Sequence, residues 1–198
     1  MFNLHIGLPG IFPDLFQSIE NMSFSEQTSW IVPADSWKTQ LRSAVNGKVK
    51  MSDFFQFGLN EIVEKISNEA DCGTVTASQH AMLGSQTDCF QKDRILAQAA
   101  RRIKRVSTIF KTVPTTFHIT LVSQSDYLQA TTNSIDDAYE IFATKNIPSW
   151  TDLISCIRAA APKQQIIVWD FQEPDKVALM FLAYMLNVQD ERQPPQSG

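Results

Sequence analysis

Three consecutive residues, Ser78, Gln79 and His80, carry the side chains best suited to chemistry in this sequence. They end and follow a short β-branched run, Gly73–Ser78 (GTVTAS), which predicts a strand leading into a polar loop. An imidazole ionises at about pH 6.5 and is suited to proton transfer near neutral pH. We therefore take His80 as a candidate catalytic residue. The alternative, a loop histidine with no chemical role, stays open.

Two further segments are expected to meet this one at the same edge of a sheet. Leu8–Asp14 follows a strand predicted at residues 2–7, and Ser123–Asp126 follows a strand predicted at 115–122. In open α/β sheets, ligands bind beyond the carboxyl ends of the strands, where such segments lie together. None of these three segments contains Lys or Arg, the residues that usually hold anionic substrates.

The other residues with ionisable side chains favour structural roles. His5 and His118 lie inside predicted strands, where a hydrogen-bonded core histidine is expected. Asp126 is expected to start a helix. The three His and three Cys are spread along the chain without metal-ligand spacing, so we expect no metal site. Basic residues at 94–105 form either an anion patch or a solvated helix face.

The hydrophobic periodicity predicts alternating strands and helices. Strands are expected at 2–7, 28–32, 73–78, 115–122 and 165–171, and helices at 14–20, 36–45, 53–66, 91–110, from Ser125 or Asp126, and at 136–144, 149–158 and 175–186. This order indicates an α/β fold with a mainly parallel sheet of about four to five strands and helices on both faces. The run QIIVWDF (165–171) is the strongest strand signal, so we expect Ile167 and Val168 at the centre of the sheet, and the helix at 175–186 to be the most buried.

Composition indicates one soluble domain at residues 1–188, followed by a disordered polar tail at 189–198. The chain has 198 residues, a formal charge of −4, 43% hydrophobic residues and 19% charged residues. The longest apolar run, Val177–Leu186, is far shorter than the ~20 residues of a membrane span, so we expect neither a span nor a secretion signal. The three widely spaced Cys suit reduced thiols in a cytoplasm, and the acidic balance argues against nucleic-acid binding.

Four segments share their order and spacing with one known family. They are HIGLPGIFPDLFQ (5–17), TVTASQHAMLG (74–84), HITLVSQSDYLQATTNS (118–134) and IIVWDFQEPDKVALMFLAYML (166–186). On these segments the chain resembles bacterial sulfotransferase-like proteins, whose pattern opens with a strand ending in H-I-G-x-P-K-T-G-T-T. The resemblance implies a P-loop type of α/β fold and binding of the anionic donor 3′-phosphoadenosine 5′-phosphosulfate (PAPS).

The first donor loop implied by the resemblance lacks the side chains that hold phosphate. Gly10 stands at the Lys position, and Ile11, Phe12, Pro13 and Asp14 stand at the Thr-Gly-Thr-Thr positions. A carboxylate about 4 Å from a phosphate oxygen repels it by about 4 kcal/mol at an effective dielectric of about 20. We expect Asp14 to cap the following helix and to fill the anion site itself.

The later donor positions differ in the same direction. Ser123 stands where the family has an Arg, Ala130 where it has a Ser, and Gln79 where it has an acid. The resemblance thus implies degenerate donor-binding positions at Pro9, Gly10, Phe12, Asp14, Ser78, Ser123 and Gln124, and it adds Gln79 to His80 as a candidate catalytic residue.

We therefore expect a sulfotransferase-like protein that acts as a non-catalytic binding or accessory protein for a protein or saccharide partner. No cofactor is expected, except PAPS or its bisphosphate product if the family activity is retained. The alternative is an active transferase that holds an atypical donor and a saccharide or small-molecule acceptor with Ser78, Gln79, His80, Ser123 and Gln124. Oligomeric assembly is left open.

Overall fold

The computed structural model describes residues 1–7, 29–31, 41–45, 53–79, 82–84, 90–91, 94–132, 135–144, 148–171 and 174–185. In chain order its elements are β1 (Phe2–Ile6), β2 (Ser29–Ile31), α3 (Asp53–Cys72), β3 (Thr74–Ser78), β4 (Phe90–Gln91), β5 (Arg94–Ile95), α4 (Ala99–Ile109), β6 (Thr115–Leu121), α5 (Gln124–Thr131), α6 (Ile135–Thr144), α7 (Trp150–Ala160), β7 (Gln165–Asp170) and α8 (Pro174–Met185). The helix predicted at 14–20 and the tail at 189–198 lie outside the described residues.

The main sheet has five parallel strands in the order β2-β3-β1-β6-β7. This confirms the predicted α/β class and its parallel sheet. From β1 the chain proceeds to the β3 side of the sheet, whereas from β6 it proceeds to β7 on the opposite side. The connections therefore diverge between β1 and β6, and a divergence of this kind opens the crevice in which α/β proteins bind ligands.

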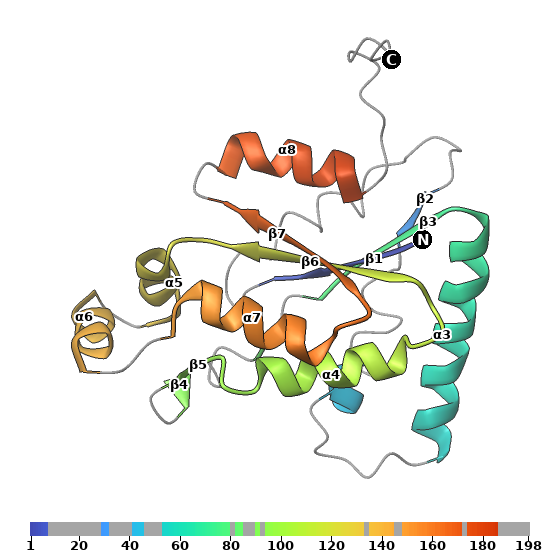
Figure 1. Ribbon diagram of the computed structural model, residues 1–198, viewed down its shortest axis with the longest axis horizontal. Coiled ribbons are helices and arrows are strands. Elements are labelled where there is room, and N and C mark those ends of the chain that lie inside the picture. The colour runs from blue at the N-terminus through green and yellow to red at the C-terminus, as the bar shows by residue number, and fades with distance from the viewer. Residues whose placement is uncertain are drawn as a thin grey trace.

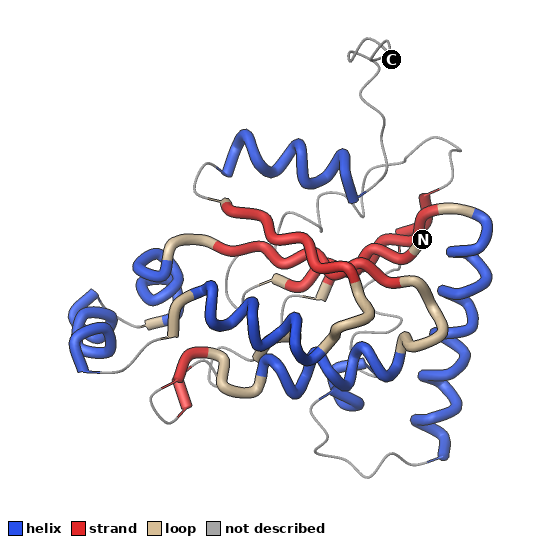
Figure 2. Tube along the Cα trace, viewed as in Figure 1, coloured by secondary structure: helices blue, strands red, loops and turns tan. Residues whose placement is uncertain are grey.

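Helices cover both faces of this sheet, as expected. Figures 1 and 2 show the strands in one central layer, with α8 on one side and the pair α4 and α7 on the other. In the described part of the chain, no helix combines the length and the apolar character needed to cross a membrane.

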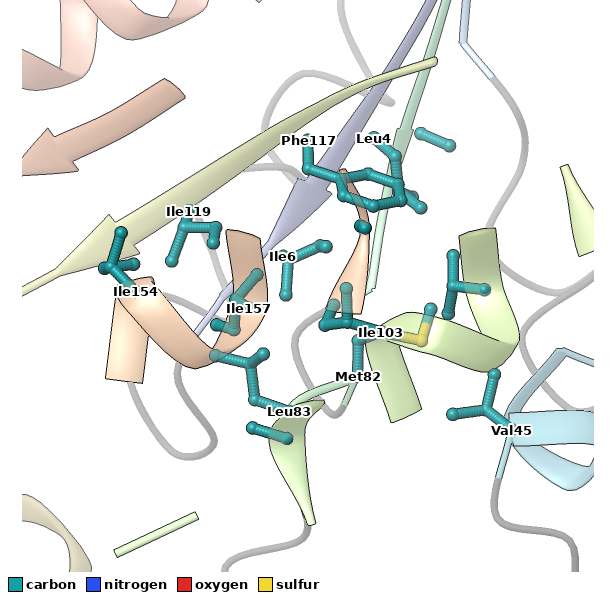
Figure 3. Close-up of a cluster of buried hydrophobic side chains, with 14 of the residues drawn as sticks. Leu4, Ile6, Val45, Met82, Leu83, Ile103, Phe117, Ile119, Ile154 and Ile157 are labelled. Atoms are coloured by element: carbon teal, nitrogen blue, oxygen red, sulfur yellow. The ribbon is translucent and has the colours of Figure 1, made fainter. Parts of the chain in front are cut away.

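Alternate side chains of a strand point to the same face of a sheet, and the alternate residues that point toward α4 and α7 are apolar. This face carries Phe2, Leu4, Ile6, Val75, Ala77, Phe117 and Ile119, all fully buried. Figure 3 shows Leu4, Ile6, Phe117 and Ile119 over Ile103 of α4 and Ile154 and Ile157 of α7. This layer is the hydrophobic core of the protein.

The opposite face, toward α8, is polar although it is equally buried. It carries Asn3, His5, Thr76, Ser78, Thr116, His118 and Thr120, of which only Ser78 is partly exposed. Burial of such groups is tolerated when each finds a hydrogen-bond partner. The carbonyl of Met185, at the end of α8, accepts from Asn3 Nδ2 at 3.0 Å and from Thr76 Oγ1 at 2.7 Å. The polar face therefore holds α8 on the sheet.

The prediction of a central strand at 165–171 is wrong. β7 is an edge strand paired only with β6 in the described sheet, and Val168 is 37% exposed while Ile167 is half-buried. The helix predicted to be the most buried, α8, leaves Met180 67% exposed and Tyr184 48% exposed. Apolar character alone does not distinguish an edge strand from a central strand, because an edge strand still buries one face. The same holds for a helix that packs on the outside of the sheet.

The prediction of a long helix at 91–110 is also wrong for the first half of that range. Phe90–Gln91 and Arg94–Ile95 form a short antiparallel pair, β4 with β5, and α4 begins only at Ala99. Leu96 has φ of 52°, a left-handed conformation that an α-helix cannot include. The predicted apolar stripe survives from Ala99 onward, where Ala99, Ile103 and Val106 are buried.

Candidate functional site at the carboxyl edge of the sheet

The described residues at the carboxyl edge are Gly7 after β1, Ser78 at the end of β3 with Gln79 after it, Val122 to Gln124 after β6, and Phe171 after β7. They adjoin the divergence point between β1 and β6. Of the predicted site residues, Pro9, Gly10, Phe12, Asp14 and His80 lie outside the described residues. The predictions for those positions remain predictions.

After β6, both predicted site residues make structural hydrogen bonds. Ser123 is the N-cap of α5, and its Oγ accepts from the backbone N–H of Asp126 at 3.1 Å. Gln124 Nε2 donates to the carbonyl of Pro148 at 2.8 Å and ties the start of α5 to the segment before α7. The helix starts at Gln124, one or two residues before the predicted start at Ser125 or Asp126. Asp126 lies in its first turn, as expected, and its carboxylate faces the positive end of the helix dipole.

After β3, Gln79 is 5% exposed and its backbone connects two strands and a turn. Its N–H donates to the carbonyl of His5 at 3.0 Å, and its carbonyl accepts from Met82 N–H at 3.3 Å. The backbone of Gln79 thus fixes the end of β3 beside the end of β1. Ser78 immediately before it is positioned by the same contacts.

His5 makes the contact that sequence reasoning missed. Its Nδ1 lies 2.9 Å from Ser78 Oγ on β3, and its Nε2 lies 3.0 Å from Thr120 Oγ1 on β6. The ring of Phe181 on α8 packs edge-on against the imidazole, with centroids 5.1 Å apart. A buried imidazole is therefore held between two hydroxyl groups at the carboxyl edge, where the chain connections diverge.

His118 lies on the same face in a different setting. Trp169 Nε1 donates to His118 Nδ1 at 3.1 Å, so His118 carries its hydrogen on Nε2, which donates to Asn3 Oδ1 at 3.2 Å. Burial lowers the pKa of His118 from 6.5 to about 4. His118 is a neutral structural histidine, as expected, in a chain of hydrogen bonds that runs from β7 through β6 and β1 to the end of α8.

A signal for this polar face was present in the sequence. In FNLHI, TVTAS and TTFHITL, the polar residues at positions 3, 5, 76, 78, 116, 118 and 120 alternate with apolar ones. Because strand side chains alternate between faces, this parity places His5, Ser78 and Thr120 on one side of the sheet. The sequence predictions treated each histidine singly and did not combine the parity of neighbouring strands.

The basic residues of α4 are divided between packed and exposed positions. Arg105 Nη1 donates to the carbonyl of Val45 at 2.6 Å, and Arg102 is 7% exposed within the packed helix layer. Arg101 and Lys104 are exposed, as in the solvated-face interpretation. Within the described residues, no group of three or more His, Cys, Asp or Glu is placed to hold a metal ion.

Comparisons with known proteins leave the family open. No family model matches the chain, and no curated protein sequence matches it. Among solved structures, an unliganded sugar kinase from Janibacter sp. HTCC2649 aligns with a TM-score of 0.39 and 11% sequence identity over 94% of this chain and 94% of that chain. A match at this level carries no information on activity.

Proposed function

We propose that this protein is a sulfotransferase-like binding or accessory protein whose carboxyl edge takes an uncharged ligand or a protein partner, and that it does not use an anionic sulfuryl donor. The observation that carries the proposal is that the residues after β6 are already hydrogen-bonded within the protein. Ser123 caps α5 and Gln124 is bonded to Pro148, so both are engaged in holding the fold.

Electrostatics supports the same proposal. A phosphate bound at a helix N-terminus needs free N–H groups, a positive dipole end and usually a cation. At the start of α5, the Ser123 hydroxyl already accepts one N–H, and the Asp126 side chain adds a negative charge to the first turn. The sequence segments 78–80 and 123–126 contain no Lys or Arg. Saccharide hydroxyls or a peptide surface require no such cation.

Adenosine 3′,5′-bisphosphate, the product of a PAPS-dependent transfer, should therefore leave the melting temperature unchanged at millimolar concentration. Each lost charged hydrogen bond is worth about 1.5–3 kcal/mol, so the loss of two, together with the repulsion of about 4 kcal/mol expected from the Asp14 carboxylate, raises a micromolar dissociation constant to millimolar or beyond. Differential scanning fluorimetry across a concentration series measures this. A saturable upward shift with a micromolar midpoint would refute the proposal and favour a working donor site.

The family resemblance predicts that donor binding can be restored. Gly10→Lys supplies a cation, Asp14→Thr removes a carboxylate, and Ser123→Arg offers a bidentate phosphate partner. The triple variant should bind the bisphosphate detectably by calorimetry although the natural chain does not. Adding Phe12→Gly in a second variant tests whether that ring occupies the donor volume.

The rescue needs a control because Ser123 caps α5. Removing the cap costs about 1 kcal/mol, so Ser123→Ala should show the same loss of stability without any gain in binding. If both rescue variants are folded by circular dichroism and neither binds, the alignment of these segments with the family is wrong.

An active transferase with an atypical site is the second candidate function. The observation that favours it is the hydrogen bond between Ser78 Oγ and His5 Nδ1, because a hydroxyl beside an imidazole is the usual pairing for nucleophilic chemistry. Incubation with PAPS and a panel of saccharide acceptors, read by mass spectrometry of the acceptor, tests it. Sulfated product that disappears in Ser78→Ala would establish this alternative.

A further inference from the structure

We propose that Ser78 is a nucleophilic serine, with His5 as its general base and Thr120 as the residue that orients His5, and that its substrates are uncharged carboxylic esters. This inference goes beyond the binding function and does not depend on it, since it concerns the chemistry of one hydroxyl group. It rests on the hydrogen bonds that join β3, β1 and β6 at the carboxyl edge.

The geometry contains the three parts that an activated hydroxyl requires. The nucleophile and base are 2.9 Å apart, and the far nitrogen of the base is 3.0 Å from a third group. His5 and Thr120 are buried, whereas Ser78 at the end of β3 is partly exposed. Ser78 is therefore the partly exposed residue of these three.

The partners of His5 allow it to accept a proton, and the partners of His118 do not. A hydroxyl can donate or accept, so both Ser78 and Thr120 can remain bonded to His5 when both of its ring nitrogens carry hydrogen. The indole N–H of Trp169 can only donate, so protonation of His118 Nδ1 would break that bond. The hydrogen bonds of His5 to Ser78 and Thr120 are therefore compatible with its protonation, whereas the bond of His118 to Trp169 is not.

The proposed reaction is acyl transfer to Ser78 followed by hydrolysis. Ser78 Oγ forms a bond to the ester carbonyl carbon while its proton moves to His5 Nδ1. The bond from that carbon to the alcohol oxygen then breaks, and the proton leaves with the alcohol. Water attacks the acyl-serine by the same route and releases the carboxylic acid, which restores Ser78. The described part of the edge places no cationic side chain beside Ser78, which suits an uncharged ester better than an anionic substrate.

Thr120 acts as a positioning residue through the tautomer of His5. When Nε2–H donates to Thr120 Oγ1, Nδ1 is free of hydrogen and accepts from Ser78. Thr120→Val removes the acceptor and favours the opposite tautomer, in which Nδ1–H donates to Ser78 and cannot take its proton. Thr120→Ser keeps the hydroxyl and should restore the natural behaviour.

The test is covalent labelling of the full-length protein with diisopropyl fluorophosphate. Ser78 Oγ would attack phosphorus, fluoride would leave, and peptide mass mapping would locate the adduct. We expect modification at Ser78 on the order of 100-fold faster than at Ser155, an exposed serine on α7, which matches the smaller gains measured for general-base assistance. Hydrolysis of p-nitrophenyl acetate should fall to the uncatalysed rate in Ser78→Ala and remain unchanged in Ser155→Ala.

The remaining variants test whether Ser78 is activated by His5 or is labelled only because it is exposed to the reagent. His5→Gln should remove the pH dependence of the labelling rate, and Thr120→Val should lower the rate while Thr120→Ser restores it. If His5→Gln does not fold, the Thr120 pair carries this decision by itself. Labelling spread over several serines, an unmodified Ser78 in folded protein, or equal rates in Thr120→Val and Thr120→Ser would each overturn the proposal. None of these outcomes depends on bisphosphate binding, so a failure here leaves the proposed binding function untouched.

Discussion

Ile119→Ala is expected to lower the free energy of unfolding by about 2–5 kcal/mol, the range for removing a large aliphatic side chain from a packed core. Ile119 is fully buried on β6, on the sheet face that Figure 3 shows against α7. The lost methyl and methylene groups leave a cavity because strands on both sides of β6 limit how far the site can close. Urea unfolding followed by circular dichroism measures the change.

Val168→Ala is the matched control. Val168 pairs with Ile119 in the β6–β7 register, yet it belongs to the edge strand and is 37% exposed. Its truncation should cost less than about 1 kcal/mol because less apolar area is removed from the interior. Equal losses for the two variants would mean that β7 lies inside the sheet, as the sequence prediction had it, and that the described order of strands is wrong.

Acidification should destabilise the protein through His118 by about 3 kcal/mol between pH 6.5 and about pH 4. The folded pKa lies below the ordinary value, so in this interval the unfolded chain binds a proton that the folded protein does not. Stability from this group is fully present above pH 6.5 and is lost as the pH falls through the folded pKa near 4. The physical cause is burial on the polar face beneath α8.

The comparison of natural protein with His118→Gln isolates this contribution. A glutamine amide can accept from Trp169 Nε1 and donate to Asn3, but it does not titrate. Urea unfolding at a series of pH values should show that the natural protein loses about 3 kcal/mol of stability relative to the variant on acidification from pH 6.5 to about pH 4. Trp169 fluorescence should change with the same midpoint, since the imidazolium cannot accept from its N–H. A difference that is constant with pH would show that His118 is accessible to water.

The strand pattern and the parallel sheet were predictable because they depend on local periodicity. Runs such as TTFHITL and FNLHI alternate strongly, so their strand type follows from short-range rules, and the alternation of strands with helices along the chain indicates the parallel arrangement. The edge position of β7 was not predictable in this way, because an edge strand with half-buried apolar residues has the same sequence pattern as a central strand. Its place depends on strand order, which no local window contains.

The candidate site shows the same division between local and long-range information. The helix predicted from Ser125 or Asp126 is present as α5, because helix starts carry local capping signals, although its N-cap is Ser123. The bond between His5 and Ser78 joins residues 73 positions apart, and that between His5 and Thr120 joins residues 115 positions apart. Only the strand register brings these groups together.

The central claim is our proposal that the carboxyl edge does not bind an anionic nucleotide, because its described residues after β1, β3 and β6 include no Lys or Arg. Isothermal titration of the natural protein with adenosine 3′,5′-bisphosphate at low salt tests it most directly, because low salt favours any electrostatic binding. We predict no heat beyond dilution at millimolar ligand. A saturable exothermic isotherm with one site per chain, weakened by Ser123→Ala, would contradict the account.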